Sequence, residues 1–256
     1  MVHILIISQH FPPDQSGNSS RIYDMSKQLV DFGCKVTVIS PFASFPHGTF
    51  KQKWKLYETK KIDGINHISI YSWNPTNNNP SFIQRTMYYL LFPLHSVFWA
   101  LFISKQYEII ISTSPPIFTG IPAIIIKRVL HKKFVYDVRD LWIQAAESLG
   151  FTNKESLLNK LSRNYEKYLF KNSDLITVTT NQIKKEILEI DPKIDQSKIH
   201  VISNGVDTSK FFKGHNKKPR MVYTGNIGYA QDLITVIKAV KKINEKVKVR
   251  FLIVGD

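Results

Sequence analysis

The sequence contains a single cysteine, Cys34, among 256 residues. One thiol cannot form an intramolecular disulfide or build a cysteine-based zinc site, so both of these frameworks are excluded. The N-terminus also lacks the basic segment of a secretory signal peptide, because Met1 leads directly into the apolar run VHILIIS. These absences favour the reducing cytoplasm, and the length allows one or two domains.

Acidic residues are scarce: there are 20 of them against 35 basic residues, which gives a formal net charge of +15. Such an imbalance describes the partners of a protein rather than its fold. An anionic membrane surface, a phosphorylated substrate and nucleic acid are all compatible with it, and so is a generally basic composition without such a partner. The basic residues are spread over many segments, and no helix-turn-helix, zinc-finger or RNA-recognition signature is present, so we expect no nucleic-acid partner.

Charge is absent altogether from residues 86–104, TMYYLLFPLHSVFWALFIS. This run is long enough to span a bilayer. However, Pro93 and His95 interrupt it, and a single span would separate strand-like segments that belong to one sheet. We therefore expect a helix or a helix pair. It either lies on a membrane surface or packs against the sheet as ordinary core, and both alternatives remain open.

Apolar β-branched runs alternate with amphipathic stretches along most of the chain. Strands are expected at 2–8, 35–40, 65–72, 108–112, 133–138, 173–180 and 198–204, and helices at 19–32, 117–130, 155–170 and 181–189. Several of the strands are apolar throughout, which is typical of a parallel sheet covered on both faces. The pattern predicts an α/β fold with a doubly wound, Rossmann-like parallel sheet over residues 1–204.

The alternation breaks at residues 205–219, GVDTSKFFKGHNKKP, and then restarts. Residues 220–256 read as strand, helix and strand, which predicts the start of a second Rossmann-like domain after an interdomain linker. Two strands and one helix do not make a stable core alone. We therefore expect the sequence to be a fragment or a truncated reading frame.

Two glycine-containing loops follow predicted strands, where open parallel sheets bind their ligands. In PPDQSGNSSR (12–21), Gly17 can adopt a positive φ, and Ser19 or Ser20 can cap the next helix. No GxGxxG or GKS/T motif is present, so the loop is either an ordinary turn or a phosphate site at a helix N-terminus. The stretch YTGNIGYAQD (223–232) repeats this arrangement and is a second candidate phosphate cradle, predicted to face the first across a cleft.

Three further loops carry polar residues at strand ends. The STSPP loop with Ser114 either contacts an acceptor or only stops a strand. In RDLW, Asp140 can act as a base or orient a hydroxyl, and Arg139 can hold it or a phosphate. The alternative is an Arg–Asp ion pair beside a packed Trp142. In SNGVD (203–207), Asn-Gly predicts a tight turn, and the following aspartate can cap it or contact a ligand.

The stretches at 12–21, 136–142 (YDVRDLW), 204–207 (NGVD) and 223–232 together resemble glycosyltransferase family 4, of the two-Rossmann-domain (GT-B) type. The likeness covers nearly the whole chain. RDLW resembles the subgroup that builds bacterial surface polysaccharides such as lipopolysaccharide or capsule, including fucosamine-type transferases. The resemblance implies a retaining, hexosyltransferase-like reaction from a nucleotide-sugar to a lipid-linked saccharide, without metal or cofactor, peripheral to the inner face of the cell membrane.

The motifs and the resemblance together place the predicted site residues. Arg139 and Asp140 are predicted to be catalytic, and Ser114 and Trp142 to contact the acceptor. The predicted donor-binding residues are Gly17, Asn18, Asn204, Gly205, Asp207, Gly225, Asn226, Gly228 and Gln231.

The sequence also departs from the family pattern. Asn18 replaces a second glycine, Asn226 and Gln231 stand where the family often carries Arg and Lys, and Asp232 replaces a glycine. The family's carboxylate pair, two Glu with seven residues between them, would lie beyond residue 256. We therefore expect this polypeptide alone to transfer no sugar at a useful rate. The alternative function is a non-catalytic remnant or a basic binding module.

Overall fold

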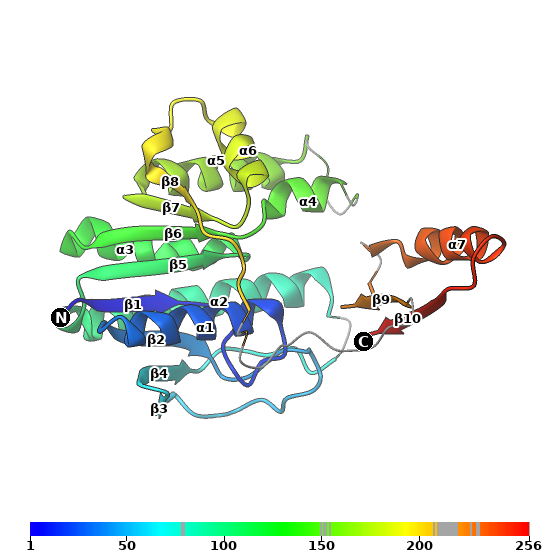
Figure 1. The fold of residues 1–256 in the computed structure, drawn as a ribbon. Helices are drawn as coiled ribbons and strands as arrows, with labels where there is room; N and C mark the ends of the chain where they lie inside the picture. The colour runs from blue at the N-terminus through cyan, green and yellow to red at the C-terminus, as the bar shows by residue number, and fades with distance from the viewer. Residues whose placement is uncertain are drawn as a thin grey trace. The chain divides into compact units, whose positions relative to one another are not determined.

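The computed structural model describes residues 1–77, 80–148, 150, 153, 155–206, 208, 220–225, 227–228 and 231–255 (Figure 1). Contacts within the chain divide it into two compact units, Met1–Gly205 and Val206–Asp256. Each unit is described by itself.

The first unit is built on one sheet of eight strands in the order β3-β4-β2-β1-β5-β6-β7-β8. The strands are β1 (His3–Ile7), β2 (Lys35–Pro41), β3 (Tyr57–Ile62), β4 (Ile65–Ile70), β5 (Ile109–Ser114), β6 (Lys133–Val138), β7 (Leu175–Val178) and β8 (Ile199–Val201). All neighbours pair in parallel except β3 and β4. The predicted α/β fold with a parallel sheet is confirmed, and the order reverses between β1 and β5, which is where such sheets bind ligands.

Helices cover both faces of this sheet. They are α1 (Gly17–Asp31), α2 (Phe82–Phe102), α3 (Gly120–Leu130), α4 (Trp142–Ser148), α5 (Leu157–Asn172) and α6 (Asn181–Ile190), with short 3-10 turns at Ser104–Gln106, Ile117–Thr119 and Gln196–Lys198. Successive residues of β1 point to opposite faces. Ile4 and Ile6 belong to the buried cluster that includes Ile22 of α1, whereas Leu5 and Ile7 belong to the cluster that includes residues of α2, α3 and α5.

The start of α1 differs from the prediction. Ser16 is the N-cap, and its hydroxyl accepts a hydrogen bond from the N–H of Ser19, whereas Ser19 or Ser20 was expected in that role. Ser16 has the extended backbone that a cap requires, and Ser19 already lies inside the helix. Gly17 is therefore the first helical residue and does not have the positive φ that the sequence allowed for it.

Strand β3 was missed in the sequence because its exposed residues are mostly charged. It forms an antiparallel hairpin with β4. The two-residue turn is Asp63-Gly64, with φ of 47° and 83°, as a hairpin turn matched to strand twist requires. The Asp-Gly pair was the signal that could have revealed the hairpin.

The uncharged segment forms one continuous helix, α2, with Pro93 inside it. Tyr88, Phe92 and Trp99 are buried against the rest of the first unit. No helix in the part of the chain that the structure describes is long and apolar enough to cross a membrane.

The second unit contains β9 (Arg220–Thr224), α7 (Leu233–Asn244) and β10 (Arg250–Val254). The two strands pair in parallel, as the strand–helix–strand pattern predicts. The pattern predicts a helix over 231–245, and the observed helix begins two residues later, because Asp232 has a left-handed backbone with φ of 40° and precedes the first helical residue.

Candidate functional site

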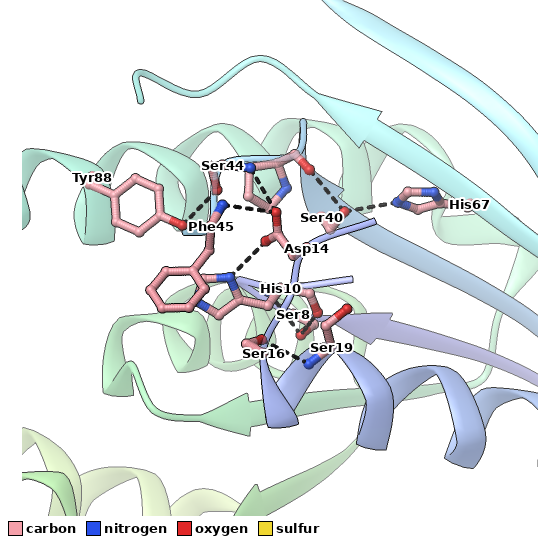
Figure 2. A network of polar contacts seen from close by, with 11 residues as sticks. Ser8, His10, Asp14, Ser16, Ser19, Ser40, Ser44, Phe45, His67 and Tyr88 are labelled. Carbon is pink, nitrogen blue, oxygen red and sulfur yellow. Dashed lines mark hydrogen bonds and ion pairs between the residues drawn. The ribbon is translucent and has the colours of Figure 1, made fainter. Parts of the chain in front are cut away.

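The β1–α1 loop is held by the carboxylate of Asp14. Its Oδ1 accepts hydrogen bonds from the N–H groups of Ser44 at 2.7 Å and Phe45 at 3.0 Å, and its Oδ2 lies 2.7 Å from Nδ1 of His10 (Figure 2). The Asp14 side chain is only 2% exposed. One buried carboxylate therefore joins the loop after β1 to the loop after β2 and orients an imidazole at the same time.

Two further contacts connect this loop pair to its surroundings. The hydroxyl of Ser44 lies 2.7 Å from the phenol of the buried Tyr88, on α2. The hydroxyl of Ser40, at the end of β2, lies 2.8 Å from Nε2 of His67 on β4 (Figure 2). Burial lowers the pKa of His67 to about 4, so this imidazole is neutral at physiological pH.

The N-terminus of α1 carries polar groups without protein partners. The amide nitrogen and oxygen of Asn18 and the hydroxyl of Ser19 are buried, and no hydrogen-bond partner for them exists within the described residues. A Cβ added to Gly17 would meet no atom within 4 Å. The first N–H groups of a helix also lack intrahelical acceptors and favour anions. This end of α1 thus offers donors and open space at the switch point of the sheet.

Arg21 and Asp137 form a buried ion pair that the sequence analysis did not predict. Nη2 of Arg21 lies 3.0 Å from Oδ1 of Asp137, and the two side chains are 11% and 1% exposed. Asp137 also accepts hydrogen bonds from Thr113 and Thr177, its paired residues on β5 and β7. A lone aspartate inside the apolar strand KFVYDV was the available signal, because an unpaired buried carboxylate is costly.

The same arginine reaches the end of the first unit. Nη1 of Arg21 donates to Oδ1 of Asn204 at 2.8 Å, and Nη2 donates to the carbonyl of Ile202 at 3.3 Å. Arg21 and Asn18 are three residues apart on α1 and so share one side of it. The structure therefore places two of the predicted donor residues, Asn18 and Asn204, around one buried arginine.

The RDLW residues lie at the end of β6. The backbone N–H and Nε of Arg139 both donate to the carbonyl of Ser114 at 3.2 Å, which brings a predicted catalytic residue onto a predicted acceptor residue. Burial lowers the pKa of the Arg139 guanidinium, while the charges of Asp137 and Asp140 oppose this shift. Asp140 is exposed, and the half-buried Trp142 contacts the rings of Tyr89 and Phe118.

After the RDLW residues, α4 and α5 are joined by charged and polar side chains. Arg163 contacts the carboxylate of Glu147, and Asn159 donates to the same carboxylate at 2.8 Å. Glu166 is 2% exposed, and its Oε2 has no partner within the described residues. Burial raises the pKa of Glu166 to about 7, and Arg163 opposes this shift.

We expect Glu166→Gln to raise the free energy of unfolding, relative to wild type, more at pH 8 than at pH 5. The folded state holds the proton of Glu166 up to a pKa of about 7, whereas the ordinary pKa of a glutamate side chain is 4.5. Its contribution to stability is therefore complete below pH 4.5 and is lost as pH rises through 7. The full effect is about 3 kcal/mol. Urea unfolding of both forms from pH 4.5 to 8 measures it, with the exposed Glu155→Gln as control. Parallel pH profiles for wild type and Glu166→Gln would contradict the assignment.

The second unit holds the remaining described donor candidates. Gly225 follows β9 with φ of 150°, and its N–H donates to the carbonyl of Val254 at 3.0 Å. Gly228 accepts a backbone hydrogen bond from Gln231, whose side chain is exposed. A Cβ on Gly255 would come within 1.8 Å of the carbonyl oxygen of Gly225, so only glycine fits there.

Several predicted features of this part are outside what the structure describes. Asp207 and Asn226 lie outside the described residues, and Gly205 is exposed at the end of the first unit. The predicted cleft between two phosphate cradles stays a prediction, as do the roles assigned to the individual site residues.

The arrangement in the first unit suits binding of an anionic, hydroxyl-rich ligand. Helix N–H groups, an amide and a hydroxyl are the donors that phosphates and sugars use. Next to them, an imidazole oriented by a carboxylate can accept or deliver a proton.

Comparison with known proteins supports one family. The family model described as Glycosyltransferase Family 4 matches residues 16–210. A comparison with curated proteins found no match.

Two solved structures of GT-B glycosyltransferases share the fold. The catalytic domain of Starch Synthase IV from Arabidopsis thaliana, bound to ADP and acarbose, is 13% identical with a TM-score of 0.70, and the match covers 99% of this chain and 68% of that one. Sucrose-phosphate synthase from Thermosynechococcus elongatus is 12% identical with a TM-score of 0.51, covering 93% of this chain and 99% of that one. At these identities the likeness shows the fold, and the family match goes further: the chain belongs to glycosyltransferase family 4.

Proposed function

We propose that this protein serves the transfer of a hexose-like sugar, with retention and without a metal or other cofactor, from a nucleotide-sugar to a lipid-linked saccharide in the synthesis of a surface polysaccharide. The family match supports sugar transfer. The retaining reaction, the kind of acceptor and the polysaccharide are the finer parts of the proposal. Retention rests on the resemblance to the family as a whole, and the acceptor and the polysaccharide rest on the resemblance of the RDLW motif.

The observation that carries the donor part is the N-terminus of α1. The amide of Asn18 and the hydroxyl of Ser19 are buried with no hydrogen-bond partner among the described residues, beside a glycine with open space. Buried polar groups are nearly always hydrogen-bonded, so a ligand or water must serve them. ADP in the structure of starch synthase IV supports a nucleotide as the kind of ligand. We place the diphosphate of the donor at this helix end.

Arg21 has a positioning role in this proposal. Its guanidinium is paired with Asp137 and bound to Asn204, so it holds the end of the first unit near the α1 N-terminus. We place the acceptor at the β5 and β6 ends, near Ser114, Arg139, Asp140 and Trp142. A location at the inner face of the cell membrane follows from a lipid-linked acceptor and is part of the proposal.

We expect Gly17→Val to weaken nucleotide-sugar binding at least tenfold without loss of stability. The space beside Gly17 is open in the protein, so valine causes no internal clash, but it would occupy the volume assigned to the diphosphate. Titration calorimetry of the 256-residue chain with UDP-, GDP- and ADP-sugars measures the change, and thermal unfolding checks the fold.

The matched control is Gln28→Val, which introduces the same side chain at an exposed position on the same helix, eleven residues further along. It should bind as the wild type does. Equal affinity of Gly17→Val and wild type, or no nucleotide-sugar binding by the wild type, would overturn the donor assignment and favour a non-catalytic binding module.

A further inference from the structure

Helix α2 exposes one continuous apolar face. Seven large apolar side chains on it are between 37% and 74% exposed: Ile83, Met87, Leu91, Leu94, Phe98, Leu101 and Phe102. Their spacing of three or four residues, closed by two adjacent residues at the end, places them on one side of the helix, about 100° wide. We call these seven residues the α2 apolar face. Most exposed apolar residues of a protein are scattered, and a contiguous set of this kind marks an interaction surface.

The opposite side of α2 is firmly anchored. Tyr88, Phe92, Trp99 and Ile103 are buried, and the helix starts with a capping box made by Ser81 and Gln84. The helix is thus apolar on both its inner and its outer side, whereas a surface helix normally turns polar residues outward. The α2 apolar face is therefore a fixed feature of the folded unit, and we expect a partner to bury it.

A basic, aromatic segment lies beside the C-terminal half of α2. The ring of Tyr57, the first residue of β3, is 4.4 Å from the ring of Trp99. The Trp99 ring in turn contacts the rings of Phe98 and Phe102, which belong to the α2 apolar face. In the segment 51–61, KQKWKLYETKK, Trp54 is 81% and Leu56 is 61% exposed. Its only acidic residue, Glu58, is paired with Lys53, Lys55 and Lys60. Five lysines against one glutamate leave this rim positively charged, and the exposed Lys105 lies just beyond the C-terminal end of the same helix.

The positive charge of this rim decides between two candidate partners for the α2 apolar face, a second copy of the chain and an anionic bilayer. Two copies of the chain meeting through this face would bring two positive rims together, which is unfavourable. An anionic bilayer offers an apolar layer for the uncharged face, headgroups for the lysines, and an interface that suits exposed tryptophan.

We propose that the α2 apolar face lies in the interface of an anionic membrane, with the lysines of segment 51–61 and Lys105 on the lipid headgroups. The inference deepens the proposed function by naming the surface that meets the lipid partner. The inner side of α2 reaches the candidate site through Tyr88, which binds Ser44, and through Tyr89, whose ring contacts Trp142. Docking would therefore hold the acceptor-side residues at the lipid surface.

The test is co-sedimentation of the 256-residue chain with vesicles of phosphatidylcholine containing 30% phosphatidylglycerol, and with vesicles of phosphatidylcholine alone. We expect binding to the anionic vesicles that weakens with salt. The triple variant Met87→Gln, Leu94→Gln, Phe98→Gln should reduce the partition coefficient at least tenfold. The variant Lys51→Gln, Lys55→Gln, Lys105→Gln should reduce it about a hundredfold, since each of the three lysines near an anionic surface contributes roughly 1 kcal/mol.

The matched control carries the same substitution at three exposed apolar positions of α7, Ile234, Ile237 and Ile243. It should bind vesicles like the wild type. Unchanged binding of the α2 triple variant, equal binding to neutral vesicles, or no vesicle binding at low salt would overturn the proposal. So would a dimer in sedimentation velocity that the α2 triple variant dissociates, because a second copy would then cover the face.

The membrane proposal and the donor assignment can fail independently, because each has its own variant and its own measurement. Gly17→Val should bind vesicles normally, and the α2 triple variant should bind nucleotide-sugars normally in calorimetry. Loss of nucleotide binding in both variants would indicate a folding defect in the α2 variant, and its thermal unfolding would show this directly. In that case the single variants Leu94→Gln and Phe98→Gln carry the test, and vesicle binding by both at the wild-type level overturns the proposal.

Discussion

Replacing Asp137 by alanine should lower the free energy of unfolding by about 3–5 kcal/mol, the usual cost of leaving one member of a buried ion pair alone. Asp137 is 1% exposed and pairs with the guanidinium of Arg21, which is itself 11% exposed. The change would also remove the acceptor of Thr113 and Thr177. Urea unfolding followed by circular dichroism measures the loss.

A double-mutant cycle separates the unpaired charge from the lost packing. Arg21→Met alone leaves the carboxylate with two threonine donors, and Arg21→Met with Asp137→Ala leaves no buried charge. We expect the double variant to be less destabilised than the sum of the single variants by more than about 1 kcal/mol, because contacting residues couple. Additive losses would show that the ion pair has no net role and that Asp137 acts through the threonines alone.

Replacing Asp14 by alanine should cost about 3 kcal/mol and release the loop after β2. The two N–H groups of Ser44 and Phe45 would lose their acceptor, and an unsatisfied buried donor costs about 1–3 kcal/mol. Thermal and urea unfolding measure the overall loss. Hydrogen exchange gives the local readout: the amides of Ser44 and Phe45 should lose protection, while those of β6 should keep it.

Three further variants keep this expectation specific. Asp14→Asn retains one acceptor oxygen and should recover part of the stability, and Gln15→Ala changes the neighbouring exposed side chain and should have little effect. His10→Ala removes only the imidazole contact of Asp14. If His10→Ala were as destabilising as Asp14→Ala, the histidine rather than the two amides would hold the loop.

The sequence was sufficient for the α/β class because the strands of a parallel sheet are buried on both faces. Runs such as HILII and KFVYDV are therefore mostly apolar and easy to recognise. The edge strand β3 was missed for the opposite reason, since it has one neighbour, faces solvent and is rich in lysine. The N-cap at Ser16 was missed because several serines surround it and only the backbone conformation chooses among them.

The sequence by itself determined the fold class, the family motifs and the loops where ligands are expected, because these depend on local patterns and on the ends of strands. Only the tertiary structure decided which distant side chains meet. Arg21 and Asp137 are 116 residues apart, and their pairing follows from the strand order, which places β6 two strands from β1 and within reach of the Arg21 side chain on α1. The same holds for α2, whose apolar residues are alike in sequence, since the packing of one side against the sheet determines which side remains exposed.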